Sequence, residues 1–325
     1  MPSKKLGFSL ILVTILIGFS SWGFLVHRTL HQLAIYSLPA PLQSFFHADM
    51  KNLVDNAPRP DVRRNSDKTE ATKHFIDLEA YGPNAANDMP LDWDAAQKKY
   101  SKDSLLKYGW GPYNVIIQFD NLVAAFKSKN KDSILFYAAD LGHYIGDLNV
   151  PLHTTLNYDG QLTGQKGMHG LWESFIPELR INQYQLYNPH KATYLKDPAA
   201  ALWKNIRHAN TLLPEMLAKE TAVSNSFTPE KKYKMQMYYG RNTRMYTKEF
   251  AEAYANELGP TVNAQLTASA NLIADFWYTA WVKAGKPVFT TRAFSNDLAT
   301  ELKSFKQNKL IQDSLLLSKK SKSEE

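Results

Sequence analysis

Long stretches in which apolar residues recur every three or four positions constrain the fold of this chain more than any other feature. Asn114–Ser128 has such residues at 115, 116, 119, 122, 123 and 126, and Ser133–Leu148 has them at Ile134, Ala138, Leu141, Ile145 and Leu148. This is the period of an amphipathic helix. The alternation typical of strands is scarce, and no internal repeat is found. The sequence therefore predicts an all-α, multi-helix bundle with long loops.

Further helices and loops complete this prediction. Helices are expected over Trp22–Leu38, Ala199–Thr221, Pro229–Leu258 and Thr261–Ala284, with proline or glycine near their ends. Tyr81–Met89 and Asn157–Gly167 are rich in Gly, Asn and Asp and are expected to be loops. With 44% hydrophobic and 21% charged residues, the chain can form a sizeable core, and we expect one helical domain over 22–303. The stretch 304–325 is expected to be a frayed helix and a solvated polar tail.

Residues 1–21 have the pattern of a secretory signal peptide. Lys4 and Lys5 precede Leu6–Phe19, which is almost wholly apolar. That run is shorter than the roughly 20 residues that a membrane-spanning helix needs. We therefore expect an exported protein, periplasmic or extracellular after signal cleavage, with an uncleaved N-terminal membrane anchor as the alternative.

The sequence contains no cysteine, which excludes several kinds of site. Disulfides, thiolate metal sites and a cysteine nucleophile are all impossible. The net charge of +7, from 38 Lys and Arg against 31 Asp and Glu, is compatible with an anionic partner but does not identify one. Any metal site in this chain must use imidazole and carboxylate ligands.

A second stripe on the Ser133–Leu148 helix is polar and contains Phe136, Asp140, His143 and Asp147. His143 and Asp147 are four residues apart, so both side chains project from one face and can bind one ion. Because the other side of the helix is apolar, we expect the polar stripe to face the interior. Buried carboxylates and imidazoles need a counter-charge, and a divalent cation supplies it.

The same combination of side chains recurs along the chain. His153 follows the helix, His169 and Glu173 repeat the spacing of four, and Asp61 and His74 add a further pair. Imidazole and carboxylate without thiolate suit zinc in hydrolytic sites. The histidines that lack such partners are interpreted as structural, although His31 lies four residues after His27 and could compete as a ligand: His31, His47, His190 and His208.

The order of these residues resembles the zinc-dependent phospholipase C superfamily, which includes the single-strand-specific nucleases of the S-one/P-one type. The matching pattern is Trp22-x4-His27, Asp61-x12-His74 and His143-x3-Asp147-x5-His153-x15-His169-x3-Glu173. The resemblance implies an all-α domain of that type with three zinc ions. Asp61, His74, His143 and Asp147 would bind the first ion, and His153, His169 and Glu173 the second. The third would take His27, Asp147 as a bridge, and the amino nitrogen and carbonyl oxygen of Trp22 at the mature N-terminus.

The resemblance leaves the substrate open between two branches. Glu173 stands where the phospholipases have Glu and the nucleases have Asp. The short spacing from Trp22 to His27, and Arg64 three residues after Asp61, instead match the nucleases. We place cleavage of phospholipid head groups slightly ahead of cleavage of single-stranded nucleic acid. A zinc-stabilised helical binding protein without catalysis is the alternative of another class; no obligatory protein partner is indicated, and the oligomeric state is open.

The chemistry that the resemblance implies is hydrolysis of a phosphodiester. Zinc lowers the pKa of water toward about 7 and so supplies a nucleophile at neutral pH. Asp61 can orient or deprotonate that water, and Arg64 can hold a non-bridging phosphate oxygen. Asp140 can orient a ligand imidazole. Four aromatic residues could stack bases or meet lipid, although a place in the core is the commoner role: Tyr81, Trp93, Trp110 and Tyr113.

Overall fold

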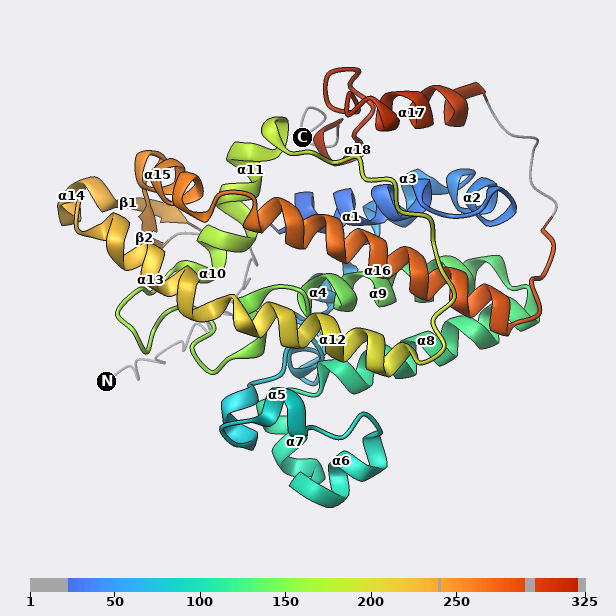
Figure 1. The fold of residues 1–325 in the computed structure, drawn as a ribbon, viewed down its shortest axis with the longest axis horizontal. Helices are drawn as coiled ribbons and strands as arrows, with labels where there is room; N and C mark the ends of the chain where they lie inside the picture. Colours follow the sequence, from blue (N-terminus) through green and yellow to red (C-terminus); the bar gives the residue numbers. More distant parts are fainter. Residues whose placement is uncertain (1–22, 239–240, 290–295, 321–325) are drawn as a thin grey trace, which may run out of the picture.

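The computed structural model describes residues 23–238, 241–289 and 296–320, and within them the regular structure is helical except for one two-stranded sheet. This confirms the predicted all-α class (Figure 1). Up to the end of the central helices, the α-helices are α1 (Phe24–Tyr36), α2 (Ala40–His47), α3 (Met50–Asp55), α4 (Arg59–Arg63), α5 (Ala85–Asp88), α6 (Trp93–Tyr100), α7 (Lys102–Tyr108), α8 (Gly111–Ser128) and α9 (Lys131–Asp147). The remaining α-helices are α10 (Met168–Gly170), α11 (Ile176–Arg180), α12 (Pro198–Thr211), α13 (Leu213–Ser224), α14 (Pro229–Lys232), α15 (Lys248–Leu258), α16 (Thr261–Lys283), α17 (Asn296–Lys306) and α18 (Leu317–Lys320).

Short helical turns of other kinds connect them. Four are 3-10 turns, η1 (Ala71–Lys73), η2 (Leu78–Tyr81), η3 (Pro151–Thr154) and η5 (Ile181–Gln183). One is a π-helical turn, η4 (Leu171–Phe175), between α10 and α11. The strands β1 (Tyr233–Tyr238) and β2 (Arg241–Tyr246) pair antiparallel as a hairpin.

Four helices form the centre of the molecule. α8 and α9 form a helical hairpin, and α16 packs across both of them, while α1 packs against α16 and α9 (Figure 1). The turn between α8 and α9 is short because Lys129 adopts a left-handed conformation and the Asn130 side chain caps α9. The apolar stripe that the sequence predicts on α9 is buried, from Ile134 to Leu148. Phe136, which we assigned to the buried polar stripe, is instead 40% exposed.

The expected helix over Ala199–Thr221 is two helices. α12 ends at Thr211 and α13 begins at Leu213, with Pro214 in its first turn. Proline has no N–H to continue the ladder of α12, but its fixed φ suits the start of a new helix. The helices expected over Trp22–Leu38 and Thr261–Ala284 correspond to α1 and α16, within the described residues.

The expected helix over Pro229–Leu258 is wrong. Only the short α14 and the later α15 are helical there, and the hairpin lies between them. Apolar Tyr233, Met235 and Met237 alternate with polar side chains, which is the period of a strand. Thr247 then accepts a hydrogen bond from the backbone N–H of Phe250 and so starts α15 as a separate helix.

The expectation of a solvated tail from 304 onward is wrong as far as Ser318. Phe305, Leu310 and Leu316 are buried, and α18 packs on α1. The Ser318 hydroxyl lies 2.9 Å from that of Thr29. The many charged residues near the chain end led us to predict a solvated tail, but the apolar residues between them pack against the core, and α18 packs on α1.

Two hydrophobic clusters meet around the polar residues of interest. The larger lies between the four central helices, and the smaller lies among η4, α13, α15 and the base of the hairpin. The apolar residues of α9 that flank His143, Leu141 and Tyr144, belong to the larger cluster, whereas Val150, Leu152 and Trp172 belong to the smaller cluster. No helix in the described ranges combines the length and apolarity needed to cross a bilayer.

Candidate metal centre

The carboxylate of Asp147, at the end of α9, lies among three imidazoles. His74 Nδ1 is 2.7 Å and His143 Nε2 is 3.3 Å from its Oδ2, and His27 Nε2 is 3.2 Å from its Oδ1. The rings of His27 and His143 stack at 4.0 Å between centroids. Asp147 is only 2% exposed. The i, i+4 pair predicted on this helix thus meets ligand candidates from α1 and from the segment after η1.

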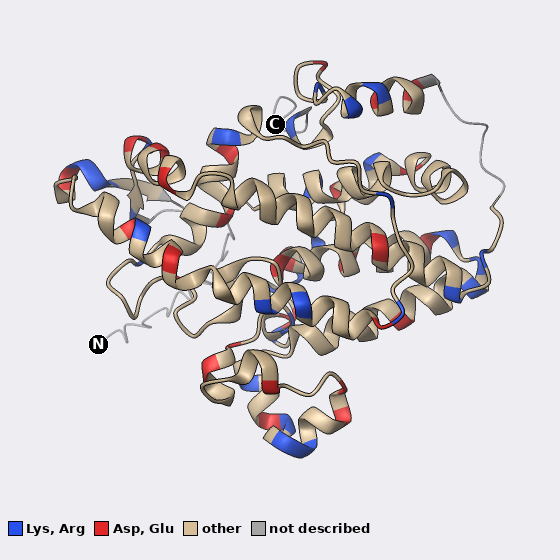
Figure 2. Ribbon diagram, in the orientation of Figure 1, with Lys and Arg blue, Asp and Glu red and all other residues tan. Residues whose placement is uncertain are grey.

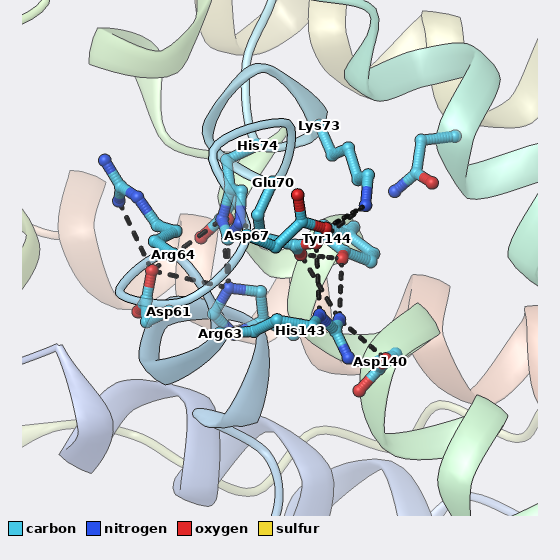
Figure 3. Close-up of polar contacts among 12 residues, drawn as sticks. Asp61, Arg63, Arg64, Asp67, Glu70, Lys73, His74, Asp140, His143 and Tyr144 are labelled. Atoms are coloured by element: carbon cyan, nitrogen blue, oxygen red, sulfur yellow. Dashed lines mark hydrogen bonds and ion pairs between the residues drawn. The ribbon is translucent and has the colours of Figure 1, made fainter.

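Asp61 closes the first group from α4. Its Oδ1 lies 3.7 Å from His74 Nδ1 and 3.8 Å from His143 Nε2 (Figure 3). Arg64, one turn later, places Nη1 3.4 Å from the same oxygen. Both side chains are partly exposed, Asp61 19% and Arg64 30%. They therefore form the solvent-facing edge of a centre that is otherwise buried.

A second group joins η3 to the helical run of α10 and η4. Glu173 Oε2 lies 2.9 Å from His169 Nε2 and 3.2 Å from His153 Nε2. The backbone N–H of His169 donates to Asp159, which fixes the start of this run. The predicted spacing of four residues therefore brings His169 and Glu173 together although a π-helical turn begins between them.

Backbone carbonyls determine which nitrogen of three imidazoles faces the centre. His143 Nδ1 lies 3.0 Å from the Ala57 carbonyl, His153 Nδ1 lies 2.8 Å from that of His74, and His169 Nδ1 lies 3.1 Å from that of Tyr158. A carbonyl oxygen only accepts, so each Nδ1 is protonated and each Nε2 of the neutral ring presents a lone pair. This arrangement is typical of histidines that bind metal ions.

His74 is held in the opposite way, by Glu70. Its Nδ1 faces Asp147, whereas its Nε2 lies 3.5 Å from Glu70 Oε1. Glu70 is fully buried and also accepts hydrogen bonds from Arg63, Lys73 and the Tyr144 hydroxyl (Figure 3). Burial alone would raise the pKa of Glu70, but these donors and His74 outweigh it and lower the pKa well below its usual value.

Glu70 was not identified from the sequence, and Asp140 has a different role from the one expected. Asp140 accepts hydrogen bonds from Arg59 and Arg63, not from a ligand imidazole. It reaches the centre only through Arg63 and Glu70 (Figure 3). The spacing of four residues from Glu70 to His74 was the available signal, but the partners of Glu70 on α4 and α9 are remote in sequence.

The electrostatics of the two carboxylates favour their charged forms. Burial raises the pKa of Asp147, but the neighbouring His143 and His153 outweigh it and hold this pKa well below the usual value. The same balance, with His169 and His153, lowers the pKa of Glu173. Burial lowers the pKa of His153, and the two carboxylates outweigh it in the other direction. Both carboxylates are therefore anions that attract positive charge.

Trp22 lies outside the described residues, but its neighbour Gly23 lies at the centre. A Cβ atom on Gly23 would be 3.1 Å from Glu173 Oε1. α1 begins directly afterwards and places His27 beside Asp147.

The histidines interpreted as structural do not join the centre. Both ring nitrogens of the buried His31 lie against backbone carbonyls, those of His27 and Ala139, and burial lowers its pKa to about 4. His31 therefore has no free nitrogen with which to compete as a ligand. His47 and His190 each pair with one carboxylate, Glu301 and Asp275, and His208 is exposed. The aromatic residues of the loop-rich region pack in or against the core, as the commoner role predicts: Tyr81, Trp93, Trp110 and Tyr113.

The donor set fits divalent metal ions such as zinc. Four overlapping triplets have ligand atoms within 4.8 Å of one another: His27, Asp61 and His143; His74, His143 and Asp147; His153, His169 and Glu173; and His27, Asp147 and Glu173. Imidazole lone pairs with anionic carboxylates, without thiolate, are the ligands of hydrolytic zinc sites.

Comparison with known proteins decides the family. The sequence model of the S1/P1 Nuclease family matches residues 22–276, most of the chain. The chain belongs to the S1/P1 nuclease family. Members of this family are secreted, zinc-dependent enzymes that hydrolyse phosphodiester bonds. The superfamily that the motif order resembles is thereby confirmed.

Two further comparisons are more distant. The alpha toxin from Clostridium absonum has a similar structure, with a TM-score of 0.49 and 14% identity over 86% of this chain and 68% of the toxin. A probable serine protease from Bradyrhizobium tropiciagri is 26% identical over 206 residues, 59% of this chain. This S1/P1-family chain spans only 25% of the length of that protein.

Proposed function

We propose that this protein is a trinuclear zinc phosphodiesterase that cleaves single-stranded nucleic acid. The observation that carries the proposal is the fixed orientation of three imidazoles, whose Nδ1–H groups are bound to backbone carbonyls while Nε2 faces Asp147 or Glu173. A purely structural histidine needs no such common orientation toward a buried carboxylate.

The ligand sets are those expected from the sequence. Asp61, His74, His143 and Asp147 would hold one ion, His153, His169 and Glu173 a second, and His27, Asp147 and Trp22 the third. Zinc held by these residues would lower the pKa of water and polarise the phosphorus–oxygen bond. The placement of Gly23 beside Glu173 supports a role for the neighbouring Trp22.

Asp61 and Arg64 would act on the substrate at the exposed edge of the centre. Asp61 Oδ1 is close to two ligand nitrogens and also partly exposed, so it can accept a proton from an attacking water. Arg64, beside it, can donate hydrogen bonds to a non-bridging phosphate oxygen and offset its charge. The buried side of the centre excludes bulk water, which strengthens these interactions.

Family membership favours nucleic acid over phospholipid, which reverses the order that we gave from the sequence. The match to the S1/P1 Nuclease model covers all the proposed ligands. Cleavage of phospholipid head groups is the second candidate, because the phospholipases have Glu at the position of Glu173, where the nucleases have Asp.

Export with removal of residues 1–21 is part of the proposal. The family match begins at Trp22, which supports a mature chain that begins there. The alternative is an uncleaved N-terminal anchor.

Parallel assays test the substrate. Purified zinc-loaded protein is incubated with single-stranded DNA, single-stranded RNA, phosphatidylcholine and bis-p-nitrophenyl phosphate. We expect cleavage of the nucleic acids and of the small diester, with a rate on nucleic acid that falls steeply with salt. Cleavage of phosphatidylcholine without cleavage of nucleic acid would favour the phospholipase. A protein that is inert on every substrate while fully loaded with zinc would instead be a zinc-stabilised binding protein.

A further inference from the structure

The β1–β2 hairpin lies in the most one-sidedly charged segment of the described chain. Between Glu230 and Glu249 the sequence has no Asp or Glu, but it has Lys231, Lys232, Lys234, Arg241, Arg244 and Lys248. Figure 2 shows the acidic residues at this end of the molecule on the helices α13, α14 and α15 and not on the strands. The hairpin therefore presents positive charge without internal compensation.

The base of the hairpin is firmly anchored. Tyr246 is 4% exposed, its ring stacks on Phe250, and its hydroxyl lies 3.1 Å from Glu220 Oε1. Lys232 Nζ lies 2.7 Å from the same oxygen and so neutralises this buried carboxylate. Lys232 therefore forms an internal ion pair with Glu220, and the positive charge of the other cations in this segment is not needed to balance that carboxylate.

The strands beyond this base are exposed. Met235 and Met237, which share one face of β1, are each 63% exposed. Arg244 is the cross-strand partner of Met235 and lies over the Tyr233 ring, with 4.3 Å from its guanidinium carbon to the ring centroid. Lys234 on the opposite face is also exposed. Exposed apolar side chains near cations that form no ion pair among the described residues are typical of an interaction surface.

The base of the hairpin contacts the segment that leads to His169. The Tyr246 hydroxyl donates to the carbonyl oxygen of Gln165, and a Cβ on Gly167 would lie 3.1 Å from the Tyr246 ring. His169, a proposed zinc ligand, follows two residues later. On the same segment Tyr158 is 55% exposed, and its carbonyl binds His169. The segment that carries the ligand His169 therefore has an exposed aromatic side chain of its own and is joined to the base of the hairpin.

We propose that this hairpin is an arm that binds the single strand of a nucleic acid substrate on its way to the centre. The proposal rests on the proposed nuclease function. Lys234 and Arg244 would contact phosphates, while Tyr158 and the two methionines would lie against unstacked bases.

A lipid surface fits the hairpin less well. Membrane-binding segments present a broad apolar face with Trp, Phe or Leu. Here the two exposed methionines are flanked by Gln236, Asn242 and Thr243, whose side chains can hydrogen-bond sugars and bases. Charge together with polar and aromatic groups therefore favours a nucleic acid strand.

Kinetics on a long and a small substrate test the arm. We compare the zinc-loaded wild type with K234Q/R244Q and with the control K98Q/K102Q, which removes the same charge from exposed lysines of α6 and α7. For each protein kcat/KM on a 20-residue oligothymidylate is divided by kcat/KM on bis-p-nitrophenyl phosphate, which is too small to reach the strands. In K234Q/R244Q we expect this ratio to fall roughly tenfold, and the salt slope on the oligonucleotide to shrink by about 1.4 for two lost phosphate contacts. The control should keep the wild-type ratio.

The remaining outcomes separate the arm from the nuclease proposal. An unchanged ratio in K234Q/R244Q, or an equal fall in the control, would overturn the arm. If the wild type hydrolyses only the small diester, the nuclease proposal fails, and anisotropy of fluorescein-labelled oligothymidylate then decides the arm: roughly tenfold weaker binding by K234Q/R244Q supports it, and equal binding overturns it. If K234Q/R244Q loses binding to phosphatidylglycerol vesicles but not to the oligonucleotide, the arm is overturned and the hairpin binds a membrane surface instead.

Discussion

At the scale of single residues, the geometry of the proposed metal centre depends on groups that are not themselves ligands. A backbone carbonyl from a different part of the fold fixes each of three imidazoles, and a carboxylate fixes His74. Because Glu70 is buried and binds three cationic or hydroxyl donors, its position is rigid. The direction of the His74 lone pair is therefore set by Glu70.

We predict that Glu70→Gln weakens zinc binding roughly 10- to 100-fold, the usual effect of removing a partner of a ligand imidazole. The amide still fills the space but loses the negative charge opposite His74 Nε2. Competition with a chromophoric chelator measures the affinity. Asp275→Asn is the matched control, because Asp275 pairs with His190 outside any ligand group. Equal zinc affinity in Glu70→Gln and the wild type would contradict this role.

A second prediction at this scale concerns pH. Burial, assisted by the nearby Glu79, raises the pKa of Asp77 to about 7, above its ordinary value of 3.8. The folded state thus binds the proton more tightly, so ionisation costs stability that is absent below pH 3.8, grows as pH rises and levels off above about pH 7. Asp77→Asn should therefore be more stable than the wild type by about 2–4 kcal/mol at pH 8 and nearly equal at pH 4. Chemical unfolding of both proteins at each pH measures the difference; a constant difference would refute the shifted pKa.

At the scale of elements, the close approach of α1 and α9 brings His27 to Asp147. Gly142 makes this approach possible, because a Cβ at that position would collide with the His31 ring. Gly146 likewise faces Leu30 and His27. His31 cannot move aside, since both of its nitrogens lie against backbone carbonyls.

Gly142→Ala should therefore destabilise the protein by about 1–3 kcal/mol, the usual cost of overpacking. It should also weaken zinc binding, because α1 has to shift and takes His27 with it. Gly170→Ala is the control, since no atom lies within 4 Å of the added methyl group. That substitution should be neutral or stabilising by up to about 1 kcal/mol. Thermal unfolding of both variants checks the prediction, and similar melting temperatures would count against it.

At the scale of the whole molecule, segments from one end of the described chain to beyond its middle meet at one centre. α1, α4, α9, η3 and η4 each contribute proposed ligands, and the C-terminal segment covers α1 from outside. Metal binding is therefore coupled to the packing of the entire domain. Asp147 lies within 3.3 Å of three imidazoles, those of His27, His74 and His143, so its replacement should lower the zinc content more than that of any other proposed ligand.

Processing of the N-terminus gives a prediction at this scale. A main-chain nitrogen can bind zinc only as a free α-amino group, because the lone pair of a peptide nitrogen is delocalised. The exported protein should therefore begin Trp-Gly-Phe-Leu and hold three zinc ions. A form with one extra residue before Trp22 should lose one ion and most activity. N-terminal sequencing and native mass spectrometry test this, and full zinc content in the extended form would exclude the amine as a ligand.

The sequence by itself determined the helical class and the order of the proposed ligands. Both are local: the helical period buries one face of α9, and a spacing of four residues brings His143 to Asp147 and His169 to Glu173 in any helix. The family resemblance rests on that same order.

Tertiary structure decided what depends on residues that are remote in sequence. The carbonyls that orient the imidazoles belong to three separate segments, at Ala57, His74 and Tyr158. The Glu70 network and the different role of Asp140 arise where α4 packs on α9. The hairpin and the buried C-terminal segment were missed because their apolar residues fit more than one local pattern. Packing against Phe250 and α1 chose between those patterns, since only contact with the rest of the core makes burying them favourable.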